Sequence, residues 1–346
     1  TLFPYTTLFR SSEYLTAYTP YQPEIAQGTL AAIFEFQTFI AQLTGQDIAN
    51  ASLYDGATAM TEAALMAMRV RKKRNKIAIG NDIHPDYREV LESYMANYAE
   101  VEITDGAPDE ETACLIVQSP DFYGQPHKYD AFRKQCDETG AMLVVVVTEI
   151  LSLGLLPAPV DTDIVCGEAQ SIGLPMSYGG PHLGFFASSS KHMRQMPGRL
   201  AGETVDEDGR RSFVLTLNTR EQHIRREKAT SNICTNQGLC ALAFTVHMAL
   251  LGEDGFKRLA RLNHEAACKL ADALESVKGV ELMNEHFFNE LTIKLPKKAK
   301  EVVGHLAAEG IIAGYPHEDK LILAATEMTR DSDITVLKNA LKGALS

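Results

Sequence analysis

Apolar residues recur at helical spacing in several segments of this chain. Between residues 23 and 43 they fall on one face of a helix, and Gly45 follows as a stop signal. The same spacing predicts further helices at about 57–71, 85–99, 128–139, 237–251, 255–277, 297–309 and 332–345. Helical segments of this length predict a chain with a large helical content.

Short apolar runs between these helices predict strands at 76–79, 101–103, 114–118, 142–147, 164–166 and 184–187. Fully apolar strands separated by helices are typical of a mostly parallel sheet that is covered on both faces. Two more strands, at 291–295 and 321–325, flank the helix at 297–309. The pattern predicts an α/β protein with a large domain over residues 12–250 and a small α+β domain over residues 251–346.

The composition is that of an ordinary globular protein. The 346 residues include 33 Lys and Arg against 45 Asp and Glu, a net charge of −12, with 45% hydrophobic and 23% charged residues. This balance excludes disorder, collagen, coiled coil and a small disulfide scaffold. The acidic charge argues against nucleic-acid and membrane partners. No continuous apolar run approaches the roughly 20 residues of a membrane span.

Six cysteines are scattered without C-x-x-C or Cys/His metal spacing. Buried, reduced thiols in a cytoplasmic protein without a metal site are the preferred interpretation over a disulfide framework. No signal peptide pattern is found.

Residues 1–11 read TLFPYTTLFRS and include no initiator Met. This string resembles the conceptual translation of a common sequencing adapter. We expect an assembly artefact fused to a truncated gene, against the alternative of a natural apolar N-terminus.

Three segments carry candidate chemistry. At 50–61, the turn formed by Gly56, Ala57 and Thr58 opens a helix, whose backbone N–H groups and positive end favour an anion such as phosphate. The alternative is an ordinary tight turn. At 171–186, the glycines Gly179, Gly180 and Gly184 permit close approach of a ligand or of another subunit. The alternative is a merely tight loop.

The densest signal is the run at 219–237, TREQHIRREKATSNICTNQ. Five basic residues stand beside a Thr/Ser/Asn run in an acidic chain: Arg220, His223, Arg225, Arg226 and Lys228. Such a cluster favours a carboxylate or phosphate site. The alternative is a solvated loop paired with Glu221 and Glu227. Nucleic acid is less favoured, because the cluster is short and lacks interleaved aromatics.

Four strings in this chain resemble one known family. They are AYTPYQPEIAQGTL at 17–30, IANASLYDGATAMTEA at 48–63, GLPMSYGGPHLGFFA at 173–187 and the long string from GRLAGETVDEDGRRSF to TSNICTNQ at 198–237. They resemble the glycine cleavage system P-protein, the pyridoxal-phosphate-dependent glycine decarboxylase, and most closely the alpha chain of its two-subunit form. The resemblance implies fold type I of the pyridoxal-phosphate enzymes, with a large mixed-sheet domain and a small C-terminal domain. It also implies that an N-terminal segment of the family is missing before residue 12.

The resemblance implies that this chain lacks the lysine that binds the cofactor covalently. Aligning Gly179–Pro181 with the family's glycine-rich loop puts Gln170 at the lysine position, and an amide cannot form the imine. Lys191 comes too late in the chain, after the following strand. The residues after the strand at 142–147 are Thr148 and Glu149, which do not match the carboxylate expected to hold the pyridine nitrogen.

The implied function is therefore that of one subunit in a cytoplasmic heterotetramer. A partner beta chain would hold the pyridoxal phosphate, glycine would lose its carboxylate, and the aminomethyl group would pass to the lipoyl arm of the H-protein. The alternative is a non-catalytic structural or docking subunit, while a free-standing transferase conflicts with Gln170. The expected cofactor or shared-site residues are Arg225, Lys228, Thr230, Asn232, Asn236, Gly56, Ala57, Thr58, Gly179, Gly180 and His182.

Overall fold

The computed structural model describes residues 19–98 and 100–345 and divides into two compact units. The first unit consists of its described residues up to 117, with 129–150 and 158–252. The second unit consists of 118–128, 151–157 and 253–346, of which residue 346 is not described. The predicted boundary after residue 250 places 118–128 and 151–157 in the large domain, whereas the structure groups them with the second unit. The expectation for residues 1–11 lies outside the described residues.

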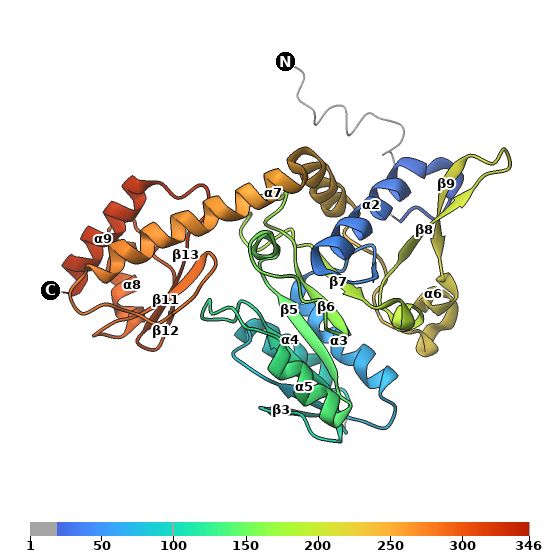
Figure 1. Ribbon diagram of the computed structural model, residues 1–346, viewed down its shortest axis with the longest axis horizontal. Coiled ribbons are helices and arrows are strands. Elements are labelled where there is room, and N and C mark those ends of the chain that lie inside the picture. Colours follow the sequence, from blue (N-terminus) through green and yellow to red (C-terminus); the bar gives the residue numbers. More distant parts are fainter. Residues whose placement is uncertain (1–18, 99, 346) are drawn as a thin grey trace, which may run out of the picture. The chain divides into compact units, whose positions relative to one another are not determined.

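A seven-stranded mixed sheet forms the centre of the first unit (Figure 1). Its strand order is β1-β7-β6-β5-β4-β2-β3. The pairs β2–β3, β2–β4 and β5–β6 are parallel, whereas β7 runs antiparallel to both β6 and β1. The strands span Ile48–Ala49 (β1), Lys76–Ile79 (β2), Glu102–Asp105 (β3), Thr112–Gln118 (β4), Met142–Val147 (β5), Ile164–Glu168 (β6) and Gly184–Ser188 (β7).

Helices surround this sheet, as its continuous apolar strands predict. They are α2 (Gln27–Thr44), preceded by the short turn η2 (Pro23–Ile25), α3 (Gly56–Val70), α4 (Pro85–Met95) and α5 (Asp130–Thr139). Every residue of β4 and β5 is buried, which requires cover on both faces. Helix α2 ends at Gly45, whose φ of 68° lies in the left-handed region that glycine adopts without strain.

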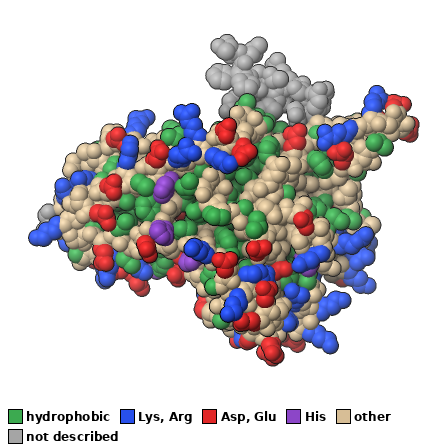
Figure 2. All heavy atoms as spheres, in the orientation of Figure 1, with side chains coloured by type: hydrophobic (Ala, Val, Ile, Leu, Met, Phe, Trp, Pro, Cys, Tyr) green, Lys and Arg blue, Asp and Glu red, His purple; other side chains and the backbone are tan. Residues whose placement is uncertain are grey.

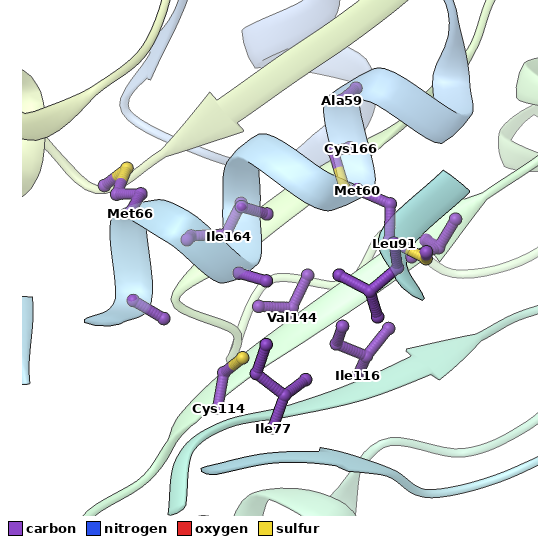
Figure 3. Packing of buried hydrophobic residues seen from close by; sticks show 14 of the residues in the cluster. Ala59, Met60, Met66, Ile77, Leu91, Cys114, Ile116, Val144, Ile164 and Cys166 are labelled. Atoms are coloured by element: carbon purple, nitrogen blue, oxygen red, sulfur yellow. The ribbon is translucent and has the colours of Figure 1, made fainter. Parts of the chain in front are cut away.

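Helix α3 packs directly on the sheet. Figure 3 shows Met60 and Met66 of α3 beside Val144 of β5, Ile164 of β6 and Leu91 of α4. All five side chains are buried in one apolar cluster. This packing fixes the position of the N-terminus of α3 against the end of β6.

A two-stranded hairpin, β8 (Leu200–Val205) with β9 (Arg211–Thr216), was not expected from the sequence. Its outer half is exposed, and the short apolar run of β9, Phe213 to Leu215, is only half-buried. Tertiary contact holds it in place instead. The side chain of Gln27 accepts from Phe213 N and donates to Phe213 O, both at 2.9 Å.

Helix α7 (Gly238–Glu275) is long and apolar enough to cross a membrane by length and composition alone. It is not one regular helix, because Gly252 has φ 61° and ψ −176°. The apolar stretch before Gly252 spans only about 21 Å at 1.5 Å per residue, against roughly 30 Å for a bilayer core. Glu253 and Asp254 follow the break directly. Its length and composition are therefore weak evidence for a membrane span.

The second unit contains a four-stranded antiparallel sheet in the order β10-β11-β13-β12. Its strands are β10 (Glu281–Leu282), β11 (Glu290–Lys294), β12 (Tyr315–His317) and β13 (Lys320–Ala324). The later part of α7, α8 (Ala299–Ala308) and α9 (Asp331–Leu345) share one apolar core with this sheet. The unit is thus a small α+β fold, as the sequence predicts.

Charged side chains of both signs are intermixed on the face of the molecule that Figure 2 shows. The net charge of −12 is therefore not gathered into one acidic patch on that face. The distribution of charge on this face therefore does not by itself indicate an anion-binding site.

Candidate functional site

The cation-rich run at 219–237 folds into short helical turns after β9. These are η5 (Asn218–Arg220), α6 (Gln222–Arg225) and η6 (Arg226–Lys228). Arg226 has φ 54°, so the backbone turns sharply between α6 and η6. Figure 1 shows α6 near the end of β8 that lies opposite the tip of the hairpin.

A cavity of about 390 Å³ lies beside these turns. Its cationic lining residues come from three separate parts of the first unit: Arg69 of α3, Arg194 of η4 (Ser190–Gln195), and Arg220, Arg225 and Lys228 of the run. The other lining residues are Gln195, Leu217, Thr219, Ala229 and Thr230. No carboxylate residue is among those that line it in the described chain. The cavity is therefore suited to an anion.

Two of these cations are anchored and partly desolvated. Arg220 is 9% exposed and donates to the carbonyls of Met196 and Gly198, the latter at 2.7 Å. Arg69 donates to Gln195 O at 3.0 Å. Burial is the main cause that lowers the pKa of Arg220 to about 10. The negative charge of Glu221 raises this pKa, and repulsion from Arg69 lowers it further. Burial also lowers the pKa of Arg69. Arg69 is half-buried, and the buried Glu62 offsets part of its charge. The buried Arg220 beside it still favours an anion in the cavity.

Arg225 and Lys228 are exposed and form no salt bridge within 4 Å to a carboxylate of the described chain. The nearby Glu221 is directed elsewhere. Its Oε2 lies 3.3 Å from Arg199 Nε and 3.5 Å from His223 Nδ1. These contacts favour an anion site over a loop neutralised by its own acids.

The other expected residues of this run lie differently. Thr230 lines the cavity, and its N–H donates to Arg220 O at 3.0 Å. Asn232 is exposed, and its carbonyl accepts from Gln222 Nε2 at 3.2 Å. Asn236 donates to Ala51 O at 3.0 Å. The structure therefore gathers Arg225, Lys228 and Thr230 at the cavity, whereas Asn232 and Asn236 are not among the residues that line it.

The second candidate, the N-terminus of α3, is filled by carboxylates of the chain itself. Asp55 caps the helix, since its Oδ1 accepts from Thr58 N at 2.7 Å and its Oδ2 from Thr58 Oγ1 at 3.0 Å. Glu168, at the end of β6, accepts from Gly56 N at 3.1 Å. Ala57 is buried in the same turn. An anion from outside would have to displace both carboxylates.

The glycine-rich loop joins β6 to β7 and presents exposed apolar side chains. Met176 and Tyr178 are exposed on it, and Gly179 (φ 102°) and Gly180 (φ 149°) have backbone conformations that favour glycine. His182 Nδ1 lies 3.7 Å from Glu168 Oε2. This candidate is a surface that faces solvent, next to the filled helix end.

The residues at the expected cofactor position make hydrogen bonds and ion pairs of their own. Gln170 Nε2 donates to Pro181 O at 2.8 Å, and Gln170 N donates to Glu168 Oε1 at 3.0 Å. Lys191 Nζ lies 3.6 Å from Asp163 Oδ1. Glu149 Oε1 accepts from Ser171 Oγ at 2.5 Å. An amide stands where the sequence comparison expects the lysine, and a carboxylate accepts from the N-terminus of α3, so these residues do not fit a covalently bound pyridoxal phosphate.

The sequence reasoning missed Arg69, Arg194 and Glu168. Arg69 lies in the last turn of α3, and Arg194 is one of two basic residues at the end of η4. Neither stands out among the 33 basic residues of the chain. Glu168 ends a buried apolar strand, and a carboxylate at the end of a parallel strand is a signal that could have been weighed.

The topology defines the class of the protein. A sphingosine-1-phosphate lyase from Burkholderia pseudomallei K96243 superposes with a TM-score of 0.69 at 14% identity, covering 98% of this chain and 82% of the lyase. The solved neighbours are fold type I pyridoxal-phosphate-dependent enzymes. The fold class expected from the sequence is confirmed.

Three further comparisons identify the family within this class. The profile of the glycine cleavage system P-protein family matches residues 5–341. The probable glycine dehydrogenase (decarboxylating) subunit 1 of Maricaulis maris (strain MCS10) is 54% identical over 362 aligned positions, covering 98% of this chain and 80% of that protein. A crystal structure of the glycine decarboxylase (P-protein) of the glycine cleavage system, in inhibitor-bound form, superposes with a TM-score of 0.92 at 42% identity, covering 98% of this chain and 81% of that chain. The chain belongs to the glycine cleavage system P-protein family, and the resemblance read from the sequence is confirmed.

Proposed function

We propose that this chain is the glycine decarboxylase subunit that does not carry the cofactor. In this proposal a second subunit of the enzyme, the beta chain, holds the pyridoxal phosphate. Glycine loses its carboxylate as CO2 there, and the aminomethyl group passes to a sulfur of the lipoyl disulfide on the H-protein. This chain supplies part of the shared site. The proposal places the complex in the cytoplasm, in agreement with the free state of all six cysteines.

One observation carries this proposal, namely the contrast between two anion positions in the same unit. The α3 N-terminus, where this fold would hold its own phosphate, donates instead to carboxylates of the chain. The cavity at the run offers five cations and no acid of its own among its lining residues. A subunit that only scaffolds its partner has no need to gather five cations around one cavity.

The cavity suits two anionic groups that such a reaction presents. Both the carboxylate of glycine and the phosphate of a cofactor held by the partner accept charge-assisted hydrogen bonds from guanidinium and ammonium groups. Arg225 and Lys228 would bind and orient such a group, and Thr230 would add a hydroxyl donor. Arg69 and Arg220 would supply fixed positive charge behind them.

The test is kinetic and uses the complete complex. Arg225→Ala and Lys228→Ala should each lower kcat/KM for glycine–bicarbonate exchange by roughly one to two decades, because a charge-assisted hydrogen bond contributes roughly 1.5–3 kcal/mol. Arg210→Ala, on the tip of the β8–β9 hairpin and away from the cavity, is the matched control and should leave the rate unchanged. Size-exclusion chromatography checks that each complex assembles.

A docking role is the alternative, and the exposed Met176 and Tyr178 on the glycine-rich loop favour it. Met176→Ser with Tyr178→Ser should weaken assembly if that loop contacts the partner. Unchanged kinetics of Arg225→Ala and Lys228→Ala in an intact complex, with weakened assembly of the loop variant, would establish docking in place of a shared site.

A further inference from the structure

The carboxylate of Glu168 connects three segments of the first unit through backbone N–H groups. Its Oε1 accepts from Leu183 N at 2.7 Å and from Gln170 N at 3.0 Å, and its Oε2 accepts from Gly56 N at 3.1 Å. These donors belong to the end of the glycine-rich loop, to the turn after β6 and to the first residue of α3. His182 Nδ1 lies 3.7 Å from Oε2. One side chain thus receives the donors that an oxyanion would use there.

Two glycines near this carboxylate, Gly56 and Gly184, are closely packed by neighbouring atoms. A Cβ on Gly56 would lie 2.1 Å from the Tyr87 hydroxyl oxygen and 3.0 Å from the backbone carbon of Gly167. A Cβ on Gly184 would lie 2.4 Å from Asp55 O. The chain is packed tightly on both sides of the α3 N-terminus, and the room next to Gly56 is taken.

Physical chemistry explains why a carboxylate is stable here. The positive end of a helix and convergent N–H groups bind phosphate and carboxylate alike. Burial raises the pKa of Glu168, while the N–H groups of Leu183, Gly56 and Gln170 and the nearby His182 act in the opposite direction. The donors therefore offset part of the cost of burying the charge.

We infer that Glu168 is a built-in anion that occupies the phosphate position at α3 and fastens the glycine-rich loop to the helix. It acts as a positioning residue, since it touches neither substrate nor cofactor. Its functional meaning rests on the proposed function, in which the partner carries the cofactor. Its hydrogen bonds belong to this chain alone, so its test needs no partner.

The test asks whether removing the carboxylate creates a phosphate site. Glu168→Ala in the full chain should bind one more inorganic phosphate per chain than the wild type, measured by isothermal titration at constant ionic strength. The wild type gives the background from the cation-lined cavity. Glu203→Ala, on the exposed hairpin, changes the net charge equally and should show only that background. A folded Glu168→Ala without the additional phosphate would overturn the inference.

A second variant covers the case in which Glu168→Ala fails to fold. Glu168→Gln keeps the volume and removes the charge. Hydrogen exchange at Gly56, Gln170 and Leu183 should accelerate together by about tenfold, since a neutral acceptor holds these N–H groups less strongly than a charged one. The same amides in Glu203→Ala should exchange as in the wild type. Unchanged protection of all three in Glu168→Gln would overturn the inference. Neither result depends on the kinetics of Arg225 and Lys228, so the two proposals can fail separately.

Discussion

The sequence predicts two anion positions in the first unit, and the structure treats them differently. The turn at Gly56 and the run around Arg225 both present hydrogen-bond donors suited to an oxyanion. At the turn, the carboxylates of Asp55 and Glu168 accept the hydrogen bonds of those donors. At the run, Glu221 pairs with the buried Arg199 and leaves the cavity to cations. The difference teaches that a donor array marks a binding site only where the fold leaves its space and charge unfilled.

Glu221, the neighbour of the cavity-lining Arg220, forms a buried ion pair with Arg199. Arg199 is 2% exposed, donates to Thr19 Oγ1 at 2.7 Å and to Tyr21 Oη at 2.9 Å, and lies 3.3 Å from Glu221. Arg199→Ala should lower the free energy of unfolding by about 3–5 kcal/mol, because Glu221 loses its buried partner and keeps the exposed His223 at 3.5 Å. Chemical denaturation measures the loss.

The control for this variant is Arg211→Ala, which removes an exposed pair with Glu203 at 2.8 Å. It should cost less than about 1 kcal/mol. Equal effects of the two substitutions would show that burial of the Arg199 pair contributes nothing to stability.

The close packing of β6 near the N-terminus of α3 predicts a second, smaller loss of stability. A Cβ on Gly167 would lie 1.8 Å from Val147 O of the neighbouring strand, so Gly167→Ala should destabilise the chain by about 2–3 kcal/mol. Gly304→Ala is the control, because no atom lies within 4 Å of its added Cβ in the middle of α8. It should stabilise by roughly 0.5–1 kcal/mol. A Gly167→Ala variant as stable as the wild type would contradict the close packing beside Glu168.

Thiol reactivity tests the same comparison without any substitution, because one cysteine lies near each of the two anion positions. Cys166 lies just before Gly167 and is fully buried, and burial raises its pKa well above the usual range. Burial likewise raises the pKa of Cys136 to about 12. Cys234, in the run, is exposed. At pH 8 a thiol reagent should modify Cys234 fast, while a thiol with a pKa near 12 is thiolate in only about one molecule in 10,000.

Mass spectrometry of digested, alkylated protein identifies the modified cysteine. Cys234→Ser should abolish the fast phase and leave the slow ones unchanged. Fast modification of Cys166 in the folded chain would show that the α3 side is open, against the closed packing described above.

The sequence by itself determined the local elements and the family. Helical spacing located α3 and α5 to within two residues at each end, and strands β2 and β5 agree residue for residue with their apolar runs. It also located Arg225, Lys228 and Thr230, because they are close together in one run. Local elements follow from contacts between residues a few positions apart, which a linear pattern records.

Only the tertiary structure decided which donors are free. Arg69 lies 156 residues before Arg225 in the sequence, yet both line one cavity, and Glu168 reaches Gly56 across 112 residues. These approaches follow from the order and register of the sheet strands and from the packing of α3 on them, as in the antiparallel pairing of Glu168 with Gly184. Strand order and side-chain direction are set by long-range packing, which short-range periodicity does not encode. The sequence therefore shows both donor arrays, and only the fold shows that the chain's own carboxylates fill one of them.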